Sequence, residues 1–323
     1  MKKRTIYLLI ICFSFTLISF SQNSTAQGQT NLEYEKAKKE YEKKMKEWER
    51  KKKEAGLKGD ALKLENEKKA HYNSGNQTYR EQNYQSSLDS YQKAIDIDPT
   101  FAGAYYGKGL ALRRLKKFPG ALIAFENTIR ADSTHSAAYA AKGGILNTTG
   151  RKREALVFYQ KAVELDPTSH VAYYQIGSIH RALKDHVKAV EAFRRSTMIK
   201  TDYHLGYFSL GVSLLSLGKT SEAILAFQST IAYNSRYYPA FYRLAKAHND
   251  LGNFKDGLDA AVQCGKLRAR YAPGRFEAGR AYENLKNYAN ALKEYELAKR
   301  DAKWRNSAQY QIDEIKRNQK KNN

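Results

Sequence analysis

The residues that could carry out chemistry in this chain are scattered, and none stands at the spacing that a known reaction requires. Gly218-Lys219-Thr220 has the ending of a phosphate-binding loop, but that motif needs a glycine five residues before Gly218, where Ser213 stands. The seven histidines include no pair at metal-binding spacing, and only two cysteines are present. We therefore expect no catalytic residue, no metal site and no cofactor, and we interpret Gly218 as the glycine that ends a helix.

The elements that would position any functional residue follow an internal repeat of 34 residues. One small residue recurs at this interval, at positions 75, 109, 143, 177, 211, 245 and 279. A second small residue follows twelve residues later in each unit, and a large ring follows four residues after that in six of the seven units. These rings are Tyr91, Phe125, Tyr159, Phe193, Phe227 and Tyr295, and Ala261 takes the place in the sixth unit.

This pattern predicts seven pairs of helices that stack on one another. Each unit holds two apolar stretches of helical period, such as 104–115 and 121–129. Small residues allow two helices to approach closely, and the ring fills the space between them. One helix pair cannot bury its apolar face, so neighbouring units must pack together. We expect the repeats to occupy residues 60–305, with units beginning near 68, 102, 136, 170, 204, 238 and 272. The sixth unit, which has Ala245, Gly257 and Ala261 at three of these places, is expected to be looser than the others.

The repeat resembles the tetratricopeptide repeat (TPR) family over about residues 68–305. Its first-helix signature is similar in Tyr105-Tyr106 before Gly109, Tyr173-Tyr174 before Gly177 and Tyr207-Phe208 before Gly211, and its second-helix signature in Ala155, Tyr159, Ala162 and Pro167. The resemblance implies an all-α fold, a right-handed superhelical solenoid of seven helix–turn–helix units. It also implies that the first helices line a concave groove for extended peptides or partner helices.

The resemblance places the fifth residue of each unit in that groove, and these residues are mostly aromatic. The predicted ligand-binding residues are Tyr72, Tyr106, Tyr174, Phe208, Tyr242 and Phe276, with the cations Arg113, Arg181, Lys246 and Arg280 on the same face. Aromatic rings with interleaved cations suit a peptide that carries apolar and acidic side chains, and they also suit stacked sugars. In the alternative interpretation, these rings pack between the repeats.

A highly charged segment, residues 27–59, precedes the repeats. Residues 31–55 are predicted to form a helix with Tyr34, Tyr41 and Trp48 seven residues apart on one face. We favour a helix whose aromatic stripe lies on the first repeat, and the alternative is a short coiled coil that self-associates. Gly56 and Gly59 are expected to break this helix, and Asp60 to cap the next one.

The first 26 residues are typical of a secretory signal peptide. Lys2-Lys3-Arg4 precede an apolar run from Ile6 to Phe20, and small residues offer cleavage after Ser21 or Ala26. The alternative is an uncleaved membrane anchor. We expect the protein to be exported to the periplasm or cell envelope of a Gram-negative bacterium. Because Cys12 lies in the signal, Cys264 would be the only thiol of the mature chain and is expected to be buried.

Residues 306–323 are predicted to form a capping helix followed by a basic tail. Ala308, Ile312 and Ile315 form one apolar stripe for the last repeat to cover, with charged residues on the opposite side. The tail, which contains Lys316, Arg317, Lys320 and Lys321, is expected to be disordered.

The formal net charge of +23 favours anionic partners. The sequence as a whole predicts a non-catalytic scaffold or adaptor that binds a protein or peptide. The alternative is a basic solenoid that binds an anionic polymer, namely a glycan, lipopolysaccharide or nucleic acid without sequence-specific reading. A third hypothesis is self-association through residues 31–55.

Overall fold

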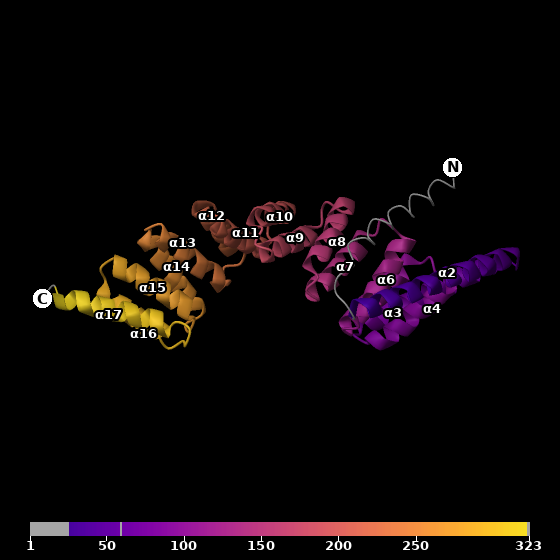
Figure 1. Cartoon of the computed structure of the whole chain (residues 1–323), viewed down its shortest axis with the longest axis horizontal. Helices are drawn as coiled ribbons and strands as arrows, with labels where there is room; N and C mark the ends of the chain where they lie inside the picture. Colours follow the sequence, from indigo (N-terminus) through magenta and orange to yellow (C-terminus); the bar gives the residue numbers. More distant parts are fainter. Residues whose placement is uncertain (1–25, 59, 322–323) are drawn as a thin grey trace. The chain divides into compact units, whose positions relative to one another are not determined.

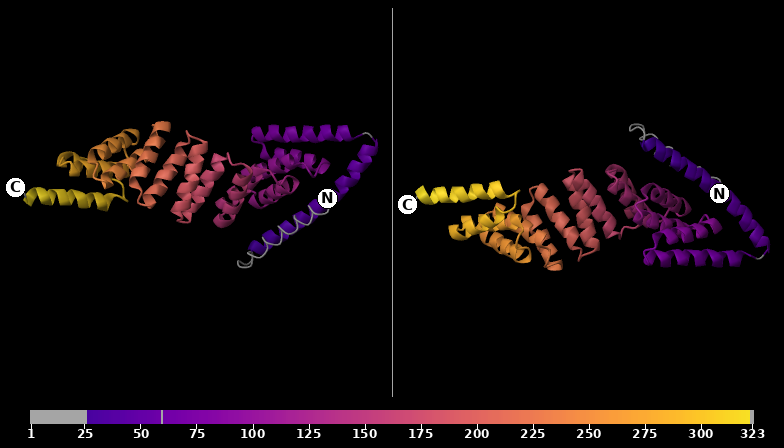
Figure 2. Two further views of the ribbon diagram at one scale, coloured as in Figure 1. Left: turned by 90° about the horizontal axis from the view of Figure 1, so that it is seen from above. Right: turned by 90° about the horizontal axis from the view of Figure 1, so that it is seen from below.

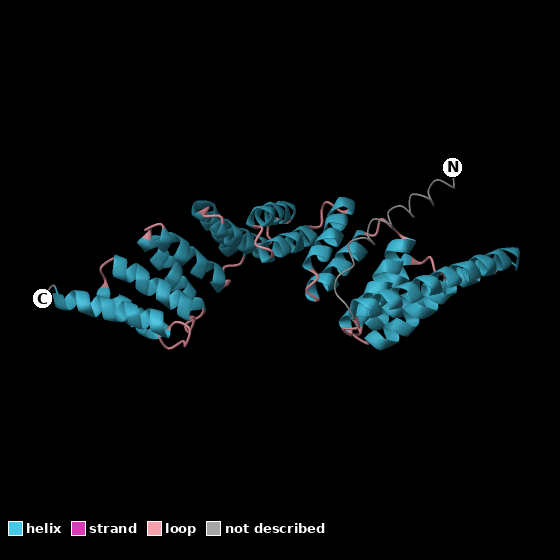
Figure 3. Cartoon of the chain, viewed as in Figure 1, coloured by secondary structure: helices cyan, strands magenta, loops and turns pink. Residues whose placement is uncertain are grey.

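The structure is a computed structural model that describes residues 26–58 and 60–321, and every element in these ranges is an α-helix (Figure 3). The predicted signal lies outside the described residues except for Ala26, which begins the first described helix. None of the helices within the described ranges has the length and apolar character needed to cross a membrane.

The chain divides into two compact units, unit 1 through Ile145 and unit 2 from Leu146 (Figure 1). Unit 1 contains α2 (Ala26–Lys58), α3 (Ala61–Arg80), α4 (Tyr84–Ile97), α5 (Ala102–Arg114), α6 (Phe118–Ala131) and most of α7 (Ser136–Thr148). Unit 2 contains α8 (Lys152–Leu165), α9 (His170–Ala182), α10 (His186–Ile199), α11 (His204–Ser216), α12 (Thr220–Tyr233), α13 (Tyr238–Asp250), α14 (Phe254–Leu267), α15 (Ala272–Asn284), α16 (Tyr288–Ala298) and α17 (Arg305–Lys321).

The helices of each unit pair as the repeat predicts, and the expected all-α fold of stacked helix pairs is confirmed. In unit 2 the first helices of the repeats are α9, α11, α13 and α15, and each packs against the helix that follows it (Figure 2). Gly218, in the turn between α11 and α12, has a φ of +72°. This left-handed conformation explains the glycine there as the end of a helix and not as part of a phosphate-binding loop.

The repeated small residue and the repeated ring touch each other inside the helix pair. A Cβ atom on Gly177 would lie 2.8 Å from Cδ1 of Phe193, and one on Gly211 would lie 2.6 Å from Cε1 of Phe227. Both rings are completely buried. These two repeats therefore each close around one ring, and the same contact recurs in the pairs Gly75–Tyr91, Gly109–Phe125 and Gly279–Tyr295.

Two ends of predicted helices need correction. The expected break at Gly56 is wrong, because α2 continues through Gly56 to Lys58. One glycine costs a helix about 1 kcal/mol, and the ion pairs Arg50–Glu54 and Lys51–Glu47 support the adjacent turns. Asp60 does precede α3, but its side chain makes no capping hydrogen bond.

The predicted disordered tail is also helical, since α17 extends to Lys321 and includes Lys316, Arg317 and Lys320. Ile312 and Ile315 are buried against unit 2 in one cluster with Ala291, Tyr295 and Ala298. This anchored face holds the central turns of α17, and good helix formers continue it to Lys321.

Candidate functional site

The predicted groove residues of unit 1 are partly exposed and lie against other rings. Tyr72 packs against Phe101, with ring centroids 4.9 Å apart, and Tyr106 packs against His135 at 4.7 Å. Arg113 lies on the same helix as Tyr106, and it has no acidic partner within the described part of unit 1.

The predicted aromatic residues of unit 2 occupy one register on α9, α11, α13 and α15 and are also partly exposed. The ring centroid of Tyr174 lies 5.5 Å from that of the buried Phe193 and 5.3 Å from that of Tyr203. Phe208 lies between Phe227 and Tyr237 in the same way, at 5.9 and 5.1 Å. Each ring therefore packs between repeats, as the alternative interpretation states. Part of each ring also stays exposed, as a groove-lining role requires.

The outer partners of these rings form a second repeated aromatic position that sequence reasoning missed. They stand immediately before a first helix, and Tyr203, Tyr237 and Tyr271 are 34 residues apart. Tyr242 contacts Tyr271 at 5.6 Å, and Phe276 contacts Trp304 at 4.9 Å. The 34-residue interval was the available signal, because Phe101 and His135 occupy the same place in unit 1.

Two of the predicted groove cations are paired within the chain. Lys246 Nζ lies 2.8 Å from Asp250 Oδ2, and Arg280 Nη1 lies 2.6 Å from Asp250 Oδ1. Burial would raise the pKa of Asp250, but the two cations outweigh burial and lower it. Arg181 differs from these residues, since it lies over the ring of Phe193 at 5.8 Å and has no acidic partner among the described residues. Among the predicted groove cations of unit 2, Arg181 is thus the one that an acidic ligand could pair with directly.

A buried polar pair lies beside these cations in the sixth and seventh repeats. Asn249 Nδ2 donates to both the backbone oxygen and Oε2 of Glu277, each at 3.0 Å. Glu277 is only 3 % exposed, and Arg280 Nη1 lies 3.5 Å from its carboxylate. The Asn249 side chain fits because a glycine faces it, since a Cβ on Gly257 would lie 2.1 Å from Asn249 Oδ1. In the repeat without a ring, where a looser core was expected, this polar side chain occupies space between the helices, and Ala245 and Ala261 are still buried.

The aromatic stripe of α2 lies on the repeats of unit 1. Tyr41 packs with Ile95 and Tyr105, and its ring centroid is 6.2 Å from that of Tyr105. Lys44 of α2 pairs with Asp96 of α4 at 3.1 Å. The favoured interpretation, a stripe that lies on the repeats, thus holds for Tyr41. The surface that α2 contacts extends beyond the first repeat to α5 and α6.

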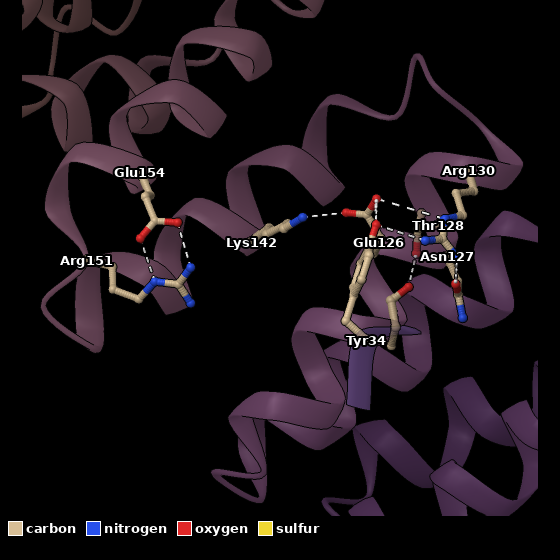
Figure 4. Close-up of polar contacts among 9 residues, drawn as sticks. Tyr34, Glu126, Asn127, Thr128, Arg130, Lys142, Arg151 and Glu154 are labelled. Atoms are coloured by element: carbon tan, nitrogen blue, oxygen red, sulfur yellow. Dashed lines mark hydrogen bonds and ion pairs between the residues drawn. The ribbon is translucent and has the colours of Figure 1, made fainter. Parts of the chain in front are cut away.

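Tyr34 of α2 contacts a group of partly buried charges on the repeats of unit 1 (Figure 4). The Tyr34 hydroxyl donates to Glu126 Oε1 at 3.4 Å and accepts from Arg130 Nη2 at 2.9 Å. Lys142 of α7 donates to the other oxygen of Glu126. Burial, followed by the charge of Glu126, raises the pKa of Tyr34. Burial would also raise the pKa of Glu126, but Lys142 and Arg130 outweigh burial and hold that pKa below its usual value.

No three histidine, cysteine or acidic side chains gather at metal-binding distance within residues 26–58 and 60–321. Cys264 is completely buried, and burial raises the pKa of its thiol to about 11. His180 is 8 % exposed, and its burial lowers its pKa.

Family models place the repeats directly. Models described as TPR repeat match residues 75–116, and those described as tetratricopeptide repeat match 106–170, 208–264 and 272–300. The chain belongs to the tetratricopeptide repeat family. TPR domains generally serve as scaffolds that bind protein or peptide partners. A model described as an Est1 DNA/RNA binding domain also matches residues 155–216, and no curated protein matches the chain.

Solved structures show the same fold. The C-terminal part of a TPR repeat-containing protein from Cytophaga hutchinsonii has a TM-score of 0.62 at 17 % identity, over 73 % of this chain and 98 % of that solved chain. PilF of Pseudomonas aeruginosa has a TM-score of 0.56 at 15 % identity, over 66 % of this chain and 96 % of its own. YrrB, described as a TPR protein with an unusual peptide-binding site, has a TM-score of 0.53 at 21 % identity, over 58 % and 98 %. At these identities the likeness concerns the TPR fold alone.

Proposed function

We propose that this TPR protein is an exported, non-catalytic scaffold or adaptor of the bacterial envelope, which binds a protein or peptide along the first-helix face of unit 2. The observation that carries the proposal is the row formed by Tyr174, Phe208 and Tyr242 on successive first helices. Each ring is partly exposed and fixed by its neighbours. Rings held in place before binding lose little conformational entropy when a ligand covers them.

Charge on this face favours a ligand that is apolar with few acidic groups. Asp250 neutralises Lys246 and Arg280 within the chain, while Arg181 remains available near Tyr174. A peptide with apolar side chains for the aromatic row and one carboxylate for Arg181 would match these groups. The export part of the proposal rests on the sequence of residues 1–26.

Crosslinking in the native cell tests this function. A photoreactive residue is placed at Tyr174 or Tyr242, and as a control at Val187, which is 66 % exposed on a second helix. We expect both groove positions to capture the same envelope protein and Val187 to capture none. Arg181→Glu should reduce the capture at Tyr174. Equal capture at all three positions, or capture that Arg181→Glu leaves unchanged, would contradict the proposed face.

The charge of +23 supports a second candidate, the binding of an anionic polymer. Binding that is driven by many ion pairs weakens steeply as salt is added, whereas binding through aromatic rings changes little. Titration of a captured partner and of a model anionic polysaccharide at two salt concentrations separates the candidates. The polymer candidate fails if the polysaccharide does not bind at low salt.

A further inference from the structure

Basic side chains gather at one edge of unit 2, where each repeat joins the next. Because the two helices of a repeat run antiparallel, the loops that connect successive repeats fall on one edge and the turns within repeats on the opposite edge (Figure 2). We call the basic side chains of the last three inter-repeat connections the basic edge: Arg236, Lys266, Arg268, Arg270, Arg300, Lys303 and Arg305. Arg270 follows Arg236 by 34 residues, and Arg300 follows Lys266 by the same interval. These pairs therefore hold equivalent places on adjoining repeats.

The charges of the basic edge are available to a partner. All seven side chains are exposed, and none has an acidic partner among the described residues of unit 2. Arg268 lies 5.0 Å from the ring centroid of Tyr238 and donates to its hydroxyl at 2.9 Å, contacts that orient the guanidinium without neutralising it. Arg275 and Lys299 are not included, because they pair with Glu294 at 2.9 Å and with Glu296 at 3.3 Å.

The opposite edge of the same repeats has no such excess. Its turns bring Asp256 and Glu283 close to Lys255 and Lys286. Asp301 is the sole acidic residue within 234–237, 266–271 and 299–305. The positive charge is thus segregated to one edge.

The chemistry of the edge favours an anionic phospholipid surface. Guanidinium groups recognise phosphate through paired hydrogen bonds, and loop tips that project side by side can meet a flat layer of headgroups. Leu267, which is 39 % exposed, lies among these charges and adds an apolar contact.

A nucleic acid or other long polymer fits less well. The rings of Tyr238 and Tyr271 meet edge to face at 4.9 Å, so they do not form the open stacking platform that single-stranded nucleic acid uses. Towards the earlier repeats of unit 2, Asp166 and Asp202 occupy the corresponding loops, and a polymer that followed the edge would meet these carboxylates.

We propose that the basic edge docks unit 2 on the surface of a membrane that contains anionic phospholipids. The basic edge shares no residue with the proposed peptide-binding face, so either proposal can fail alone. In such docking each basic residue near the surface adds to the affinity, and added salt weakens it.

Vesicle binding by the full chain tests the proposal. The probes are vesicles of phosphatidylcholine alone and vesicles in which part of the lipid is phosphatidylglycerol. The edge variant carries Arg236→Gln, Arg268→Gln, Arg270→Gln and Arg300→Gln. The control variant carries Arg153→Gln, Arg195→Gln, Lys219→Gln and Lys255→Gln, which lower the net charge equally at exposed sites of unit 2 off this edge. Binding to neutral vesicles measures any contribution of the apolar N-terminal residues, and circular dichroism checks that both variants keep the helical content of the parent chain.

We expect the added phosphatidylglycerol to strengthen binding of the parent chain and of the control variant. The edge variant, which lacks four of the seven charges, should lose roughly a thousandfold in affinity for the anionic vesicles. The proposal is overturned if phosphatidylglycerol does not strengthen binding, or if the control variant loses as much affinity as the edge variant. It is also overturned if a single-stranded oligonucleotide binds the parent more tightly than the anionic vesicles at the same salt concentration and the edge variant loses that binding.

Discussion

The ring of Phe193 lies directly over Gly177, the residue sixteen positions earlier, and a Cβ at Gly177 would come within 2.8 Å of that ring. Phe193 is completely buried, so it has no free space into which it could move. The 34-residue repeat places a glycine opposite a large ring in this way. The glycine and the ring together set how closely the two helices of a repeat approach.

Adding one methyl group at Gly177 should therefore destabilise the protein. Alanine raises helix propensity by about 1 kcal/mol, but overpacking a filled core costs about 1–3 kcal/mol. We expect Gly177→Ala to lower the free energy of unfolding, as measured by urea denaturation. The control is Gly265→Ala in α14, where the new Cβ would meet only the flexible end of Arg275 at 3.4 Å. If both variants are equally stable, the Phe193 contact does not restrict this position.

The repeat could be predicted because it depends on residue size at fixed intervals, and size is visible in the sequence. The pairing of Arg280 with Asp250 could not be predicted, because these two residues come from different repeats, 30 residues apart. Lys246 and Asp250 stand four residues apart on α13, so their pairing was visible in the sequence as helical ion-pair spacing. A resemblance to a family gives the face on which a cation lies, but not the neighbour that neutralises it. For this reason only Arg181 keeps its predicted availability in unit 2.

The contact of α2 with the repeats illustrates a second limit of prediction from the sequence. The heptad spacing of Tyr34 and Tyr41 indicates an apolar stripe, yet it does not say whether another copy of the helix or the repeats will cover it. The answer depends on contacts with Tyr105, Glu126 and Arg130, although the same residue types also occur at equivalent places of other repeats, at Tyr173, Glu296 and Arg300. Contacts that occur once in a repeat array leave no periodic signal.

The buried pair Asn249–Glu277 predicts an interaction between two substitutions. Gly257→Ala should be strongly destabilising in the parent chain, because its Cβ would overlap Asn249 Oδ1 at 2.1 Å. Asn249→Ala alone should cost roughly 2–4 kcal/mol, since it leaves Glu277 buried with fewer hydrogen bonds. In the double variant the overlap is gone, so Gly257→Ala should cost much less than it does in the parent.

A double-mutant cycle of unfolding free energies measures this coupling. Glu277→Gln serves as a comparison, because it keeps the size of the side chain and removes its charge. Additive effects of Gly257→Ala and Asn249→Ala would contradict the packing described for this repeat.

The thiol of Cys264 should react with alkylating reagents only after the protein unfolds. It is completely buried, and its pKa is raised to about 11, so little thiolate forms at neutral pH. We expect iodoacetamide to label Cys264 much faster in denaturant than in its absence, as followed by mass spectrometry of the peptide that contains it. Rapid labelling of the native protein would show that the sixth repeat opens readily, as the sequence alone had suggested.

Acid should release α2 from the repeats of unit 1, because its contact through Tyr34 depends on the ionised form of Glu126. Lys142, Arg130 and Tyr34 all contact this carboxylate, and its pKa in the docked state lies below the ordinary value of 4.5. A group with a depressed pKa stabilises the state that binds fewer protons. The contribution of Glu126 to the folding stability of unit 1 is therefore complete above pH 4.5 and is lost as the pH falls through the lower pKa of the folded state.

The fluorescence of Trp48 reports this release, since Trp48 lies on α2 and is partly buried. In a chain with Trp304→Phe, acid should make Trp48 more accessible to a neutral quencher before the helical content falls. Glu126→Gln should lower the free energy of unfolding of unit 1 at neutral pH by on the order of 1–2 kcal/mol, because Lys142 and Arg130 lose their carboxylate. The same change should remove the response to acid, whereas Glu54→Gln, on an exposed part of α2, should preserve it. An unchanged acid response in Glu126→Gln would mean that another group controls how α2 binds to the repeats.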